Sequence, residues 1–135
     1  DHMKTLRALG NLAQTRFELG RYEESMALLA ELAEREAGAL PPDHYAHGTT
    51  LQLTGRCHDA LGRPERAEPL LLKGACRLVT SLGPEHPRAA QSVEQVIAFY
   101  ESQGRHSDGT LLREAAENTK DVQTVLERFA SEVDE

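Results

Sequence analysis

The residues of this chain that could do chemistry begin with its six histidines. His44 and His47 are three residues apart, so on a helix they would share one face and could hold a metal ion. His58 and Asp59 lie further along the same segment. However, His44 recurs as His86 in a similar local sequence, which favours a repeated turn over a metal site. We therefore expect no metal and no cofactor.

The two cysteines, Cys57 and Cys76, could form a redox-active pair. Two cysteines are too few for a disulfide framework, and neither lies in a C-x-x-C motif. Free cysteines usually behave as small, buried hydrophobic side chains. We therefore expect two reduced thiols in adjacent helices and, from their reduced state, a cytoplasmic location.

The sequence carries no pattern that indicates catalysis. An enzyme needs a nucleophile, a base and an orienting group in one pocket, whereas these histidines are dispersed. There is also no P-loop, no G-x-G-x-x-G and no nucleophile elbow. The chain is therefore predicted not to be an enzyme and to have no catalytic residues.

Charge and hydropathy narrow the kind of partner. The net charge of -7 argues against binding to nucleic acid or to an anionic membrane, because both need clustered Lys and Arg. No apolar run approaches the roughly 20 residues that span a bilayer. The expected partner is a protein.

The elements that position a binding site are predicted to be helices. The 135 residues suit one domain, and 39% hydrophobic with 27% charged residues is typical of a folded chain. Aromatic residues make up only 4% and Trp is absent, so Leu, Ala and Val must build the core, which suits close-packed helices. Residues 1–3 resemble a cloning remnant, so we expect a piece of a longer protein.

Two landmarks share a 42-residue period. Gly20, Gly62 and Gly104 have this spacing, and each follows a helical pattern and precedes an Arg. The pattern Leu-x-Pro-acidic-His at 40–44 recurs at 82–86. Because glycine tolerates the left-handed conformation that often ends a helix, the three glycines are predicted to lie in turns between helices.

The period predicts one helix pair per repeat. The three repeats would cover about residues 4–39, 40–81 and 82–118. In the second repeat, Asp43 is the expected N-cap because it follows two prolines. With one further helix at the C-terminus, the chain is predicted to contain seven helices and no strand.

The final segment, 119–135, is predicted to be a helix that caps the third repeat. It has an apolar stripe at helical spacing with acidic residues on the opposite side: Val122, Val125, Leu126, Phe129 and Val133. The end of a solenoid otherwise exposes apolar surface to water. The alternative is that this stripe meets the same stripe of a second copy and forms a homodimer.

Three segments carry a resemblance to a known family. LGRYEESMALL at 19–29 and LGRPERAEPLL at 61–71 resemble the turn and second helix of the tetratricopeptide repeat. LGPEHP at 82–87 is similar to the linker of the 42-residue form found in kinesin light chains. The match departs at Ser25 and Gly109, where the family prefers Ala. The resemblance implies a right-handed α-solenoid whose first helices line a concave groove that holds a peptide or helix of a partner protein.

Polar side chains of the predicted first helices recur in columns with the same period. Their amides could bond the main chain of an extended ligand, because a side-chain amide both donates and accepts. The predicted partner-binding residues are Arg7, Asn11, Gln14, Gln52, Arg56, Asp59, Gln91, Glu94 and Gln95. Arg56 ranks first because it belongs to the middle repeat, although it could instead pair with Asp59 on its own helix surface.

The charges in these columns predict the kind of ligand. Arg56 together with Asp59, Glu94 and Glu101 favours a ligand of mixed or slightly basic charge. The basic carboxylate clamp of chaperone-binding members is not visible, so an acidic C-terminal chaperone motif is disfavoured. Three alternatives stay open: an ordinary solvated helix face, a regulatory or sensor domain of a larger signalling protein, and a self-assembly module.

Overall fold

The structure, a computed structural model, describes residues 2–118 and 121–134, and these residues form seven α-helices and no strand. The helices are α1 (His2–Glu18), α2 (Tyr22–Ala39), α3 (Tyr45–Ala60), α4 (Pro64–Leu82), α5 (Pro87–Ser102), α6 (His106–Glu117) and α7 (Val122–Asp134). The predicted all-α class is confirmed. Residue 1 of the expected cloning remnant and residues 119, 120 and 135 of the final segment lie outside the described residues.

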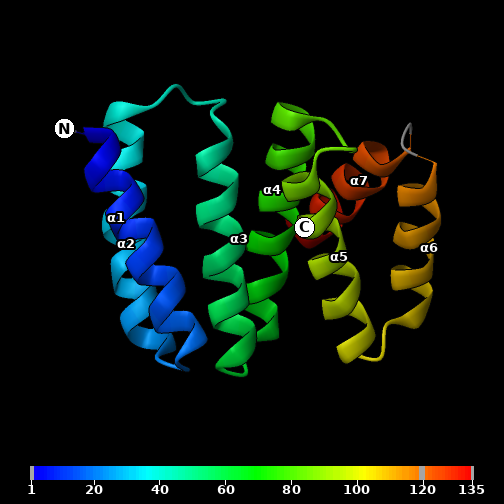
Figure 1. Ribbon diagram of the computed structural model, residues 1–135. Coiled ribbons are helices and arrows are strands. Elements are labelled where there is room, and N and C mark those ends of the chain that lie inside the picture. Colours follow the sequence, from blue (N-terminus) through cyan, green and yellow to red (C-terminus); the bar gives the residue numbers. More distant parts are fainter. Residues whose placement is uncertain (1, 119–120, 135) are drawn as a thin grey trace.

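The first six helices form three antiparallel pairs that stand side by side (Figure 1). Each pair contacts the next one, α2 with α3 and α4 with α5. The first helices of the pairs, α1, α3 and α5, all run from the top to the bottom of Figure 1. This arrangement is the α-solenoid that the repeat period predicts.

The three glycines of the period end the first helices in the same conformation, as predicted. Their φ angles are 77° at Gly20, 76° at Gly62 and 76° at Gly104. In the first turn the Gly20 N–H donates to the Phe17 carbonyl at 3.0 Å, and the Arg21 N–H donates to the Arg16 carbonyl at 2.8 Å. These two bonds form a Schellman motif, which satisfies the last carbonyls of the helix. The same pair of bonds recurs at the other two glycines.

The linkers between repeats also repeat, but the expected N-cap at Asp43 is wrong. His44 caps α3 through its Nδ1 atom, which accepts a hydrogen bond from the Ala46 N–H at 3.1 Å. His86 caps α5 in the same way, accepting from the Arg88 N–H at 3.1 Å. A neutral imidazole nitrogen can accept such a bond, so histidine can replace the usual capping residues. The recurrence of histidine is thus explained by the linker turn.

Two of the three arginines that follow the glycines connect successive repeats, whereas Arg21 pairs with Glu24 of its own repeat. Arg63 of the second repeat lies 3.5 Å from Glu23 of α2. Arg105 of the third repeat reaches Glu68 of α4 at 2.7 Å, and its guanidinium also lies 4.5 Å from the centre of the Tyr100 ring. Each of these two arginines therefore contacts the second helix of the repeat before it.

Helices α3 and α4 meet through glycines. A Cβ atom added to Gly74 would lie 2.8 Å from the Gln52 Oε1 atom and 2.9 Å from the Gly48 carbonyl oxygen. Real Cβ contacts are not this short, so only glycine permits the observed approach of the two backbones. The buried apolar side chains form one cluster on α1 to α3 and a second on α4 to α7, on either side of this contact.

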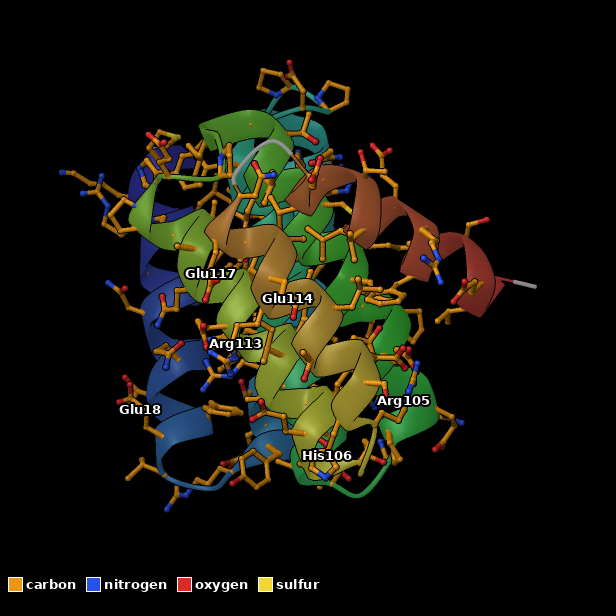
Figure 2. The ribbon with its side chains drawn as sticks, turned by 90° about the vertical axis from the view of Figure 1, so that its right-hand side faces the viewer. Glu18, Arg105, His106, Arg113, Glu114 and Glu117 are labelled. Atoms are coloured by element: carbon orange, nitrogen blue, oxygen red, sulfur yellow. The ribbon has the colours of Figure 1, made fainter. Side chains whose placement is uncertain are left out.

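Helix α7 lies across the second helices instead of continuing the row. It packs against α4 and α6, and Figure 2 shows it on the side of the molecule opposite α1. Val122, Leu126 and Phe129 are at most 2% exposed, and the Phe129 ring meets Tyr100 edge-on with 5.4 Å between centroids. The pattern alone placed this helix on the third repeat. Its contact with α4 arises because apolar side chains of α4 join the same cluster and also need cover.

Candidate partner-binding groove

A cleft of about 580 Å³ runs across the first helices α1, α3 and α5. Because these helices are parallel neighbours, equivalent positions of successive repeats come side by side across the cleft. Seven of the nine predicted residues line it: Arg7, Asn11, Gln14, Gln52, Arg56, Gln91 and Gln95. The structure therefore brings together residues from all three repeats.

Gln52 lines the cleft but has a role inside the fold. It is only 5% exposed, and its Nε2 atom donates to the Ser92 carbonyl at 2.9 Å, which ties α3 to α5. Its Oε1 atom has no hydrogen-bond donor among the described residues and lies against the backbone of Gly74. Gln52 is therefore part of the cleft floor, and the neighbouring exposed side chains are better placed to contact a ligand.

Arg56 does not pair with Asp59, which was the alternative that its own helix allowed. Its guanidinium lies 4.5 Å from the centre of the Phe17 ring, so it stacks across from α3 to α1. Arginine stacks well on aromatic rings because its guanidinium is flat and weakly hydrated. This stacking fixes the side chain while leaving the guanidinium N–H groups for another partner.

Asp59 lies in an adjoining cleft of about 400 Å³ near the C-terminal ends of the first helices. Arg56 and the Phe17 and Phe99 rings also line this space. Burial raises the pKa of the Asp59 carboxyl. Its carboxylate has no ion-pair partner within residues 2–118 and 121–134.

Glu94 is not part of the cleft lining. Arg113 of α6 lies 3.3 Å from Glu94 and 3.2 Å from Glu101, so one guanidinium contacts both carboxylates of α5. Figure 2 shows Arg113 on α6 directed toward α5. The sequence columns placed both glutamates near the groove but could not show that a second helix neutralises them.

Arg88 is a cleft residue that the sequence analysis missed. It lies three residues before Gln91 on the same helix, so helical spacing places the two on one face. Its guanidinium lies 5.4 Å from the centre of the Tyr45 ring, and Tyr45 in turn stacks on His44 at 4.7 Å. The 42-residue period does place Arg88 in a column with Lys4 and Ala46, so the basic residues at positions 4 and 88 were the signal that could have found it.

Neither cysteine has an environment that favours reactivity. Both are free thiols, Cys57 in α3 and Cys76 in α4. Burial raises the pKa of Cys57, and burial together with the nearby charge of Glu127 raises that of Cys76 to about 11. A thiol with a raised pKa carries little of the reactive thiolate. In the part of the chain that the structure describes, no three His, Cys, Asp or Glu side chains are grouped to hold a metal, and no helix is long and apolar enough to cross a membrane.

Comparison with known families identifies the repeat. The family model described as the tetratricopeptide repeat matches residues 4–75, which is more than half of the 135 residues and extends from α1 into α4. The comparisons with curated proteins and with solved structures gave no match.

Proposed function

The chain belongs to the tetratricopeptide repeat family, whose repeats mediate contacts between proteins, and on this premise we propose that its groove docks an extended or helical segment of a partner protein. The observation that carries the proposal is a cleft to which all three first helices contribute side chains. Repeated faces that remain free after the helix pairs have stacked are the usual binding surfaces of solenoids.

The chemistry of the lining suits a protein main chain. Asn11, Gln14, Gln91 and Gln95 can each donate to a carbonyl and accept from an N–H, so they can bond an extended segment without fixing its sequence. Apolar contacts come from Leu29, Leu32 and Leu53 at the floor. The cleft spans only three repeats, so we expect an affinity of about micromolar, or roughly -8 kcal/mol.

Other partners and assembly modes have less support. The net charge of -7 disfavours nucleic acid and anionic membranes. A homodimer through the apolar stripe of α7 would need that stripe on the surface, whereas α4 and α6 cover it within one chain. A regulatory domain of a larger protein would use the same cleft for a segment of its own chain.

The proposal can be tested with a library of random 12-residue peptides displayed on phage and selected on the immobilised protein. Enriched peptides would be synthesised with a fluorescent label and titrated by anisotropy against wild type, Arg56→Ala and Arg35→Ala. Arg35 is a suitable control because it lies on α2, outside the cleft, where it pairs with Glu31. We expect Arg56→Ala to weaken binding roughly tenfold and Arg35→Ala to leave it unchanged.

Circular dichroism would establish that both variants remain folded. Selected peptides that bind the folded Arg56→Ala and wild-type proteins equally would show that the groove assignment is wrong. A library from which no peptide is enriched would also count against the proposed function.

A further inference from the structure

Resting on the proposed function, we infer that the partner segment is acidic and that Arg113, outside the cleft, is a residue that sets this preference. The first observation is the composition of the lining. Arg7, Arg56 and Arg88 line the main cleft, and no Asp or Glu is among its lining residues. The chain as a whole has 22 acidic and 15 basic residues, so the charge of this lining is opposite in sign to the net charge of the chain.

The second observation is that these three guanidinium groups lack acidic partners inside the described fold. Of the nine other arginines, three (Arg16, Arg66 and Arg77) also form no ion pair among the described residues, and six do: Arg21, Arg35, Arg63, Arg105, Arg113 and Arg128. Among the described residues, none of the three cleft arginines lies within 4.0 Å of a carboxylate.

Aromatic rings orient two of the three cleft arginines. Arg56 lies over Phe17 at 4.5 Å, and Arg88 lies over Tyr45 at 5.4 Å. A guanidinium that is stacked on its flat side keeps its N–H groups for a carboxylate, which it can bind with two parallel hydrogen bonds.

The third observation concerns the acidic residues next to the cleft. Glu94 and Glu101 of α5 both contact Arg113, at 3.3 and 3.2 Å. Without that guanidinium, these two carboxylates of α5, outside the lining, would offset part of the charge of the arginine nearest to them, Arg56, whose equivalent position on α5 lies between them. Arg113 therefore acts through Glu94 and Glu101 and need not touch the ligand.

Two carboxylates near the groove have no arginine partner among the described residues: Asp59, and Glu18, which accepts a hydrogen bond from Gln14 at 3.0 Å. Both belong to the C-terminal ends of first helices, and this indicates where the acidic stretch crosses.

Asp59 belongs to the adjoining cleft at the level of Phe99, whereas Arg88 lies eleven residues earlier on α5. Eleven helical residues correspond to about 16 Å along the helix axis. The acidic stretch therefore contacts Arg7 and Arg88 away from Asp59, while Arg56, which lines both clefts, contacts the part of the segment nearer to Asp59.

This charge pattern revises the mixed or slightly basic ligand expected from the sequence. That expectation counted Glu94 and Glu101 as open groove charges, and the structure pairs them with Arg113.

The test uses the peptides enriched from the random 12-residue library. We expect Asp and Glu to be over-represented in them relative to the unselected library, and the affinity to fall as salt increases. Enriched peptides that are neutral or basic but still depend on Arg56 would overturn the acidic preference and leave the proposed function standing. Tighter, Arg88-dependent binding of a labelled 12-nucleotide thymidine oligonucleotide would overturn the choice of a protein segment.

Three variants test the residues, with one acidic peptide as the probe. Arg88→Ala is expected to weaken binding roughly tenfold, because it removes a charged hydrogen-bond partner. Arg113→Gln is expected to weaken it about two- to fivefold, because exposed charges act through solvent. The triple variant Arg113→Gln, Glu94→Gln, Glu101→Gln should bind the peptide as tightly as wild type does, because the two carboxylates that Arg113 neutralises in wild type are replaced by uncharged amides. A triple variant that remains as weak as Arg113→Gln would refute the indirect role of Arg113.

Discussion

The guanidinium of Arg56 lies 4.5 Å from the centre of the Phe17 ring, so the second repeat contacts the first across the floor of the groove. A substitution at residue 56 can separate the contribution of stacking to peptide binding from the contribution of charge. Arg56→Lys keeps the charge but loses the flat guanidinium, so we expect peptide binding intermediate between wild type and Arg56→Ala. Anisotropy titration of one selected peptide against the three proteins measures this order. Equal affinity for Lys and Arg would show that only the charge matters.

Glu36 of α2 is a buried carboxyl whose ionised form is unfavourable. It is 4% exposed, accepts one hydrogen bond from the Thr50 hydroxyl at 2.8 Å, and burial raises its pKa above 4.5. Because the folded state binds this proton more tightly than the unfolded state, protonated Glu36 contributes to the free energy of unfolding. The contribution is complete below pH 4.5 and is lost as the pH rises through the folded-state pKa.

We expect Glu36→Gln to raise the free energy of unfolding at pH 7, and the gain should shrink as the pH approaches 4. Urea titrations at several pH values measure it. Glu34→Gln, an exposed change on the same helix, serves as the control and should show no such trend. A destabilised Glu36→Gln at pH 7 would mean that the carboxylate form is favoured in the fold.

The contact between α3 and α4 predicts a costly substitution at Gly74. The added Cβ of Gly74→Ala would lie 2.8 Å from Gln52 Oε1 and 2.9 Å from the Gly48 carbonyl, so the helices must separate. Overpacking of this kind costs about 1–3 kcal/mol. Gly38→Ala on α2 is the matched control, because its Cβ would meet no atom within 4 Å, and it should stabilise by about 0.5–1 kcal/mol. Thermal unfolding of both variants gives the comparison.

Phe129 joins α7 to the rest of the chain. Its side chain is 2% exposed and its ring lies against Tyr100. Phe129→Ala should therefore lower the free energy of unfolding by about 3 kcal/mol while the molecular mass in solution stays constant. Light scattering coupled to size exclusion measures the mass. A clean change from dimer to monomer would instead support assembly through the α7 stripe.

The thiols provide a check on the redox state. Cys57 is 0% exposed and the pKa of Cys76 is raised to about 11, so both should react slowly with iodoacetamide in the folded protein at pH 8. Unfolding the protein in denaturant without reductant should release two reactive thiols per chain. Finding none would indicate a disulfide and would reverse the expected redox state.

The sequence by itself determined the number of helices, their order and their turns. This was possible because each of these features depends on neighbours within a few residues. The glycine at 20, 62 and 104 ends a helix by its own backbone freedom, and the repeat period is visible without any long-range contact. The side-by-side placement of Arg7, Thr49 and Gln91 followed from the same period, because equivalent positions in stacked repeats must align.

Only the tertiary structure decided which charges in the groove remain available. The sequence places Arg56, Asp59 and Glu94 together among the groove residues, yet Arg56 stacks on Phe17 while Glu94 pairs with Arg113 of another helix. Such pairings depend on the angle and distance between helices far apart in the sequence, which a periodic pattern does not specify. The return of α7 onto α4 is decided in the same way, by the apolar surface that remains after the repeats have packed.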